Sequence, residues 1–284
     1  SLLVREILQY ASTIDEAIAI AKSKSTFVSE TIMVGSKKDG RAVLIEKSPK
    51  KMGVYDTNSD VLVCANHYQS NVFVRDEINI TNIKESDSRY RYARMNELLQ
   101  NSYPLTPIDA AKVLRDQKDF GGGNLGIGNP RAINQLIAHH SVIIQPETET
   151  FYVSTNDYQL GEFIGYDLKS VFKTGKTNSA QTIPADPFLK STQYKDFKLF
   201  RATKKKITSY LMFDSELNLT SRQLKDFISE NPAYYATYEL VGDYYFKKGN
   251  KTEASKYFKM ALTKKVASES TVKEIRKKIK SCKL

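Results

Sequence analysis

Cysteine and histidine are scarce in this sequence, and their scarcity excludes several kinds of site. Cys64 and Cys282 are the two cysteines among 284 residues, too few for a disulfide framework or a cysteine-rich zinc site. Of the three histidines, His139 and His140 are neighbours leading into an expected strand, where adjacent side chains point to opposite faces. His67 has no carboxylate cluster beside it. We therefore predict no metal site and no cofactor.

Long apolar runs are absent as well. No run approaches the ~20 residues that a membrane-spanning helix needs, so we predict no membrane span. The chain opens at Ser1 without a methionine and shows no signal peptide, and its localisation, cytoplasmic or exported, stays open. A composition of 40% hydrophobic and 26% charged residues is that of an ordinary globular protein.

Acidic residues are outnumbered by basic ones. The chain has 43 Lys and Arg residues against 32 Asp and Glu, a net charge of +11. Much of the excess lies in the C-terminal part, at residues 204–206, 247–248, 264–265 and 276–283. Such runs on amphipathic helices are usually solvated faces. A basic surface for an acidic partner is the alternative, but no nucleic-acid-binding motif accompanies the charge, and we predict no nucleic-acid partner.

The first 172 residues carry signals for both helices and strands. A helix is predicted over residues 2–10, and a capping box from Thr13 to Glu16 starts a second helix. Residues 27–34 and 41–46 alternate in hydrophobicity around Asp39-Gly40, which predicts a hairpin. Further strands are expected at residues 53–55, 61–65, 141–144, 151–154 and 166–172, and further helices at residues 88–99 and 106–115. This order predicts an α+β fold and not a doubly wound sheet.

The remainder of the chain differs in composition. Residues 173–185 are rich in Thr, Ser, Gly and Lys, which is typical of a linker. Residues 186–284 are helical in pattern, and the segment from Leu240 to Ala261 fits one tetratricopeptide-like helix pair. One unit is too few for a solenoid, so a structural appendage is favoured over a partner-binding role. We therefore predict an α+β domain over 1–172, a linker over 173–185 and a helical region over 186–284.

Two further patterns suggest chemistry but have a simpler explanation. Gly121-x-Gly123-x-x-Gly126 matches the dinucleotide-binding string, yet a helix precedes it in place of a strand and Pro130 interrupts the continuation. We interpret it as a loop near a site. Cys64 lies in an apolar run, where a small buried hydrophobe is favoured over a reactive thiol.

Two clusters remain as candidates for a catalytic site. Asn66 follows the expected strand 61–65 directly, and an Asn amide can donate hydrogen bonds to a developing oxyanion without carrying charge. A turn-forming Asn is the alternative. Ser88, Arg91 and Arg94 are spaced by three and share one face of a helix. A partly buried arginine there would bind a carboxylate or a carbonyl; a solvated face or a structural salt bridge is the alternative.

Together these clusters resemble the acyl-coenzyme A:6-aminopenicillanic acid acyltransferase family, autoproteolytic relatives of the bile-salt and penicillin V amidases. The resemblance covers roughly residues 1–172 and depends on the order of several motifs. They are Ser12-Thr13-Ile14-Asp15-Glu16-Ala17, Val43-Leu44-Ile45-Glu46-Lys47-Ser48-Pro49, Ala65-Asn66-His67-Tyr68, Ser88-x-x-Arg91-x-x-Arg94 and Gly165-Tyr166-Asp167-Leu168.

This resemblance implies part of an Ntn-hydrolase αββα sandwich. The nucleophile of such enzymes is an N-terminal cysteine exposed by self-cleavage, with its own α-amino group as the base. The resemblance also implies that Asn66 contributes to the oxyanion hole and that Ser88 and Arg91 support the site. The nucleophile itself is expected upstream of Ser1. Ser1 is the alternative nucleophile, but residues 2–10 are predicted as a helix, whereas the nucleophile of this fold begins a strand.

The sequence therefore predicts a portion of an amide hydrolase or acyltransferase that acts on the C–N bonds of small acylated amines or peptide-like amides. The chain alone is predicted to be inactive without the upstream segment of the same protein. The expected partners are that segment and a small acylated amide or thioester substrate, with a second copy of the chain, in a homo-oligomer, as a further candidate. The alternative is a non-catalytic protein-binding module.

Overall fold

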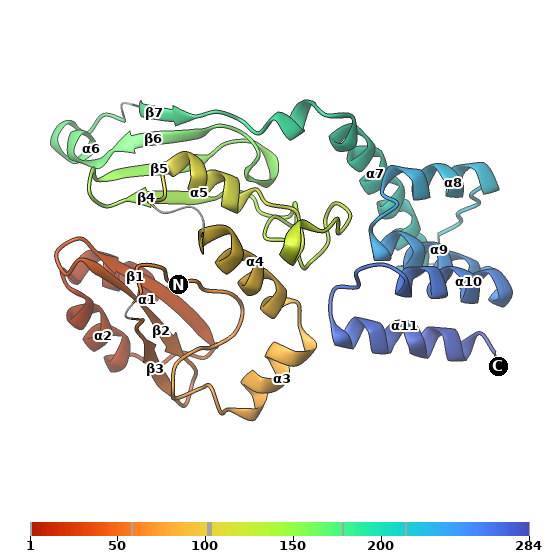
Figure 1. Cartoon of the computed structure of the whole chain (residues 1–284), viewed down its shortest axis with the longest axis horizontal. Helices are drawn as coiled ribbons and strands as arrows, with labels where there is room; N and C mark the ends of the chain where they lie inside the picture. Colours follow the sequence, from red (N-terminus) through yellow and green to blue (C-terminus); the bar gives the residue numbers. More distant parts are fainter. Residues whose placement is uncertain (1, 58, 101–103, 178, 214, 284) are drawn as a thin grey trace.

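The structure is a computed structural model that describes residues 2–57, 59–100, 104–177, 179–213 and 215–283. Ser1, the alternative nucleophile, lies outside the described residues. Figure 1 shows two antiparallel sheets with helices around them, followed by a helical C-terminal region. The predicted α+β class is confirmed; the more specific αββα sandwich stays a prediction. Every helix in the described part of the chain is too short or too polar to cross a bilayer.

The first sheet follows two N-terminal helices. Thr13 caps the second helix, and its hydroxyl accepts a hydrogen bond from the Glu16 backbone N–H at 3.2 Å, which confirms the predicted capping box. The strands pair in the order β1-β2-β3, with Ile32 opposite Ile45. Alternate residues of the sheet and one face of each helix form a shared core. The elements are α1 Leu2–Tyr10, α2 Ile14–Ser23, β1 Glu30–Ser36, β2 Arg41–Lys47 and β3 Met52–Tyr55.

Two helices lead from the first sheet toward the second (Figure 1). They are α3 Glu77–Glu85 and α4 Ser88–Gln100. Before them, residues 61–65 form no strand, so this prediction was wrong. The apolar run is not paired with a neighbouring strand; instead the Val63 carbonyl accepts a hydrogen bond from the Gln69 side-chain amide at 2.8 Å. An apolar run alone does not supply the partner that a strand requires.

The second sheet is a four-stranded antiparallel meander packed against α5. Side chains along each strand alternate between the two faces of the sheet, and Ile143, Tyr152 and Phe163 are buried on the face toward the helix. The strand predicted at residues 166–172 ends at Asp167, whose carboxylate caps a short helix by accepting from the Lys169 and Ser170 backbone N–H groups. The elements are α5 Pro107–Leu114, β4 Val142–Gln145, β5 Thr150–Ser154, β6 Phe163–Asp167, α6 Leu168–Thr174 and β7 Ser179–Ile183.

The segment 173–185 holds the end of α6 and the whole of β7, which pairs with β6. This polar segment therefore forms the edge strand of the sheet. Its backbone supplies the hydrogen bonds, and Ile183 is buried. The division of the chain into domains at this segment stays a prediction.

The C-terminal region is helical, as predicted. Aromatic residues fill its core, and the Phe200 and Phe227 rings stack with centroids 4.8 Å apart. At Gly242 an added Cβ would lie 2.6 Å from the Phe258 ring, so the small residue allows α9 and α10 to approach closely. The tetratricopeptide-like character of this pair stays a prediction. The helices are α7 Thr192–Met212, α8 Ser221–Glu230, α9 Tyr235–Lys247, α10 Lys251–Leu262 and α11 Glu269–Ser281.

The glycine-rich segment, residues 121–130, connects this helical region to α4. Gly126 has φ +75°, and an added Cβ would lie 2.3 Å from the Tyr234 backbone nitrogen. Both the backbone conformation and the close contact therefore require glycine. The Ile127 backbone N–H donates to Asn231 Oδ1 at 3.0 Å, and Asn231 Nδ2 donates to the Ile127 carbonyl at 2.9 Å. The Pro130 carbonyl accepts from Arg91 Nη1 at 2.7 Å.

Candidate active site

The loop that carries Asn66 is held by two side chains from neighbouring elements. Glu46 of β2 is fully buried, and its carboxylate accepts from the backbone N–H groups of Gln69 and Ser70 at 2.5 and 2.9 Å. Asn79 of α3 accepts from the Tyr68 backbone N–H at 2.9 Å and donates to the Tyr68 carbonyl at 3.0 Å. Buried polar groups with satisfied hydrogen bonds fix a backbone strongly. These contacts fix the loop in place, although no strand precedes Asn66.

The amide of Asn66 is oriented by Arg91. Asn66 lies in a bend with an exposed side chain, and Arg91 Nη2 donates to its Oδ1 at 2.5 Å. Arg91 is itself 9% exposed and is paired with Asp87 at 2.5 Å. Asn82 Nδ2 fixes the backbone by donating to the Asn66 carbonyl at 2.6 Å. Because Oδ1 is occupied by the guanidinium, the Nδ2 group of Asn66 is the end of the amide left to donate to another molecule.

Ser88 reaches the same site through His67. Ser88 is fully buried at the start of α4, and its Oγ lies 2.8 Å from His67 Nδ1. The Tyr92 ring, one turn further along α4, meets the His67 ring edge-on at 5.2 Å between centroids. The structure thus brings Asn66, Ser88 and Arg91 together, with His67 between the serine and the cavity. Their catalytic roles stay predictions.

His67 has its pKa lowered from the ordinary value. Burial is the largest cause, the positive charge of Arg91 acts in the same direction, and the negative charge of Glu46 opposes both. The imidazole is therefore neutral at neutral pH.

This shift predicts a pH dependence of stability. Between the lowered folded-state pKa and the unfolded value near ~6.5, the unfolded chain binds more protons at His67 than the folded one. The stability that neutral His67 contributes is therefore present above about pH 6.5 and is lost as the pH falls through the folded-state pKa. An NMR titration of the imidazole should give a midpoint below ~6.5, and the fall in unfolding free energy should be shallower in His67→Gln. A midpoint at or above the unperturbed value would contradict the burial argument.

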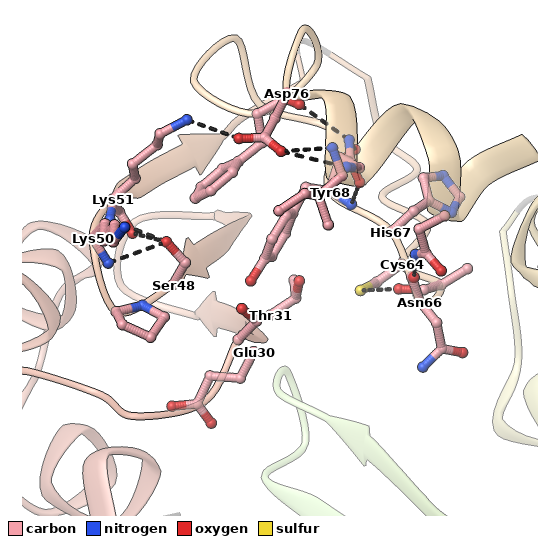
Figure 2. Close-up of a pocket in the computed structure, with 17 residues that line it drawn as sticks. Glu30, Thr31, Ser48, Lys50, Lys51, Cys64, Asn66, His67, Tyr68 and Asp76 are labelled. Atoms are coloured by element: carbon pink, nitrogen blue, oxygen red, sulfur yellow. Dashed lines mark hydrogen bonds and ion pairs between the residues drawn. The ribbon is translucent and has the colours of Figure 1, made fainter.

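A cavity of about 800 Å³ lies in front of these groups. Figure 2 shows the side chains of Cys64 and Tyr68 extending into the space, which Glu30 and Thr31 of β1 and the turn around Ser48 enclose on the other side. A volume of this size matches that of small-molecule sites, ~300–1,000 Å³. Its wall combines apolar surface with the polar groups of Asn66 and His67.

Cys64 lines the cavity but is not activated there. Burial, and secondly the negative charge of Glu46, raise the pKa of its thiol. The thiol donates to the Ala65 carbonyl at 3.5 Å, and a thiolate is the nucleophilic form of cysteine. Cys64 is half-buried and faces the cavity, so it is less enclosed than the small core hydrophobe that we had expected.

Arg94 points away from this cavity. Its guanidinium makes two hydrogen bonds to Asp116, at 3.0 and 2.8 Å, and a third to Glu97 at 2.8 Å. Glu97 in turn accepts from the Gly121 backbone N–H at 3.0 Å. Arg91 therefore holds Asn66, whereas Arg94 holds the start of the glycine-rich segment through Glu97.

Sequence reasoning missed several residues that build the site. His67 had been considered only as a metal ligand, and Glu46, Asn79 and Asn82 had not been assigned a role. The position of His67 directly after Asn66 was the available signal, because two neighbouring polar side chains in a fixed loop can line the same cavity. Within the described residues, no three or more His, Cys, Asp or Glu side chains gather as a metal site.

The fold and the site define an α+β protein with an arginine-held asparagine amide at a cavity of substrate size. The family model of acyl-coenzyme A:6-aminopenicillanic acid acyl-transferase matches residues 1–125. This segment, which holds Asn66, His67, Ser88 and Arg91, is therefore similar to that family, and the predicted resemblance is confirmed over these residues. The match supports an acyltransferase or Ntn-hydrolase type of protein. No curated protein and no solved structure matches the chain.

Proposed function

We propose that this chain contributes the oxyanion-binding half of an active site that cleaves, or transfers the acyl group from, a small acylated amine. The observation that carries the proposal is the Asn66 amide, whose Oδ1 is held by Arg91 at 2.5 Å at the wall of the cavity. Preorganised donors aimed at developing negative charge are a large source of catalysis in acyl transfer. The family match over residues 1–125 supports the same chemistry.

The nucleophile in this proposal is an N-terminal cysteine on an upstream segment. Among the described residues that line the cavity, Cys64 is the one thiol, and its pKa is raised. It also lies within the chain and has no free α-amine to act as base. In the proposed reaction the upstream thiolate attacks the carbonyl carbon, and Asn66 Nδ2 donates to the resulting oxyanion. Collapse of that intermediate expels the amine, which takes a proton from the α-ammonium group.

Exposed apolar residues on the sheets support the presence of such a segment. On β4, Ile143 faces α5, so Val142 and Ile144 point to the opposite face, where they are 43% and 61% exposed. On β1, Ile32 faces the N-terminal helices, and its neighbour Met33 is 49% exposed. Exposed apolar positions grouped on sheet faces are typical of surfaces that another element covers. We propose that the upstream segment packs there and completes an αββα sandwich.

A comparison of two proteins tests this function: the complete protein with its upstream segment, and the 284-residue chain alone. Both are incubated with a panel of N-acyl amines and peptide-like amides, and release of the free amine is measured. The complete protein should release amine, whereas the chain alone and a variant without the upstream cysteine should not. An upstream segment without any Cys, Ser or Thr nucleophile would overturn the proposal. Binding without cleavage would favour a non-catalytic binding module instead.

A further inference from the structure

A second cavity lies on the helical region, away from Asn66. This groove, of about 560 Å³, runs between the end of the glycine-rich segment and α7. Phe197, Phe200 and Leu136 are buried side chains that line it, as does the buried Tyr234. At its outer edge Met212 and Phe213 remain 73% and 66% exposed. The groove therefore offers apolar surface, and its volume suits one small molecule.

The wall formed by α7 is positively charged. Lys204 and Lys205 lie three and four residues after Arg201, so the three cations lie on the side of the helix that also carries Phe197. Within the described part of the chain, no Asp or Glu lines the groove. These three cations also have no ion pair among the described residues.

Aromatic rings hold two of the cations in place. The Arg201 guanidinium lies 5.0 Å from the centroid of the Tyr158 ring, and Lys204 Nζ lies 5.8 Å from that of the Tyr234 ring. Such contacts orient a cation but leave its charge uncompensated. Lys204 is half-buried, and burial followed by the charge of Arg201 lowers the pKa of its ammonium group. A bound anion would compensate this cost.

We propose that the groove binds a free amphiphilic anion, a medium-chain aliphatic carboxylate, with its head group at Arg201, Lys204 and Lys205 and its chain on the phenylalanine side chains. The positive edge selects the charge of the ligand, and the apolar lining selects its chain. The volume of the groove favours a single free molecule over a membrane surface or a folded partner. This inference is independent of the proposed function, because none of its residues lines the Asn66 cavity.

Isothermal titration calorimetry on the 284-residue chain tests the proposal with dodecanoate below its micelle concentration. Dodecanoate should bind, and dodecyltrimethylammonium and acetate should bind at least about tenfold more weakly. The double variant Arg201→Gln/Lys204→Gln should weaken dodecanoate binding about tenfold or more, because hydrogen bonds to charged groups are the strong ones. Lys195→Gln/Lys206→Gln is the matched control. It removes the same charge from exposed positions of the same helix outside the groove and should leave the affinity unchanged.

Three outcomes would overturn the proposal. Equal binding of the cationic detergent would mean that the apolar surface alone is responsible, and an equal loss in the control variant would mean that only net charge matters. Binding to anionic lipid vesicles or to an acidic peptide, without binding of free dodecanoate, would assign the groove to another partner. Phe213→Ser, at an exposed rim position, gives a second variant in case the double substitution disturbs folding. It should weaken dodecanoate and leave acetate unaffected.

Discussion

Replacement of Asn66 by alanine in the complete protein is expected to lower the turnover of a cognate amide by about 10²–10³-fold, the usual effect of losing one oxyanion donor. The oxyanion exists only after attack on the carbonyl, so kcat should fall and KM should change little. Arg91, which holds the Asn66 amide at 2.5 Å, would keep its contacts to Asp87 and Pro130 in the variant. The loss should therefore report the missing donor and not a rearranged loop.

Asn96→Ala is the matched control for this measurement. Asn96 lies on α4 outside the cavity, where its amide donates to the Tyr92 carbonyl at 2.9 Å. Steady-state kinetics on one amide substrate should show an unchanged kcat for this control. If Asn66→Ala turns over the substrate as fast as the unsubstituted protein, Asn66 has no place in the oxyanion hole.

Removal of the Arg94 guanidinium should give a large loss of stability. Arg94 and Asp116 have side chains 9% and 13% exposed and are joined by two hydrogen bonds. Truncation of one partner leaves the other charge buried and unpaired, which costs about 3–5 kcal/mol. Arg94→Met should therefore lower the free energy of unfolding by about this amount in urea denaturation. Hydrogen bonding to Asp116 raises the pKa of Arg94 above its usual range, in keeping with a strongly paired cation.

A double substitution separates the unpaired charge from a general loss of packing. In Arg94→Met/Asp116→Leu both charges are gone, and much of the stability lost in the single variant should return. Lys112→Met serves as the control, because Lys112 pairs with Asp109 at 2.9 Å but is 72% exposed, and exposed pairs contribute little. A single variant as stable as the parent would show that the Arg94–Asp116 pair does not hold the fold.

Local signals were the predictable part of this fold. Thr13 starts the helix that its capping box predicts, and Thr106 caps the helix predicted over residues 106–115. A cap is a contact over three residues, so it can be recognised without knowledge of the rest of the chain. The spacing of Ser88, Arg91 and Arg94 likewise predicted that they share one face of α4, and the structure shows that all three are buried.

The remainder of the site depends on contacts that no local pattern contains. The backbone beside Asn66 is fixed by Glu46, which is more than twenty residues earlier in the chain. Ser88 meets His67 across a similar separation. The apolar run 61–65 has the composition of a strand, yet strand formation depends on a partner, and residue pairing between distant segments cannot be read from periodicity. The same reasoning explains β7, whose polar residues join a sheet through their backbone.

The contacts between the helical region and the glycine-rich segment make the Asn66 site sensitive to truncation of the C-terminal helices. Asn231 and Lys265 of the helical region hold the Ile127 backbone and the Asn129 amide, and Pro130 immediately afterwards accepts from Arg91. Deletion of the last seventy or so residues would leave the Ile127 backbone groups and the Asn129 side-chain amide without these partners, a few residues from the Pro130 carbonyl that accepts from Arg91. Such a truncation is therefore expected to disturb Arg91, and through it the orientation of Asn66, although it removes neither residue.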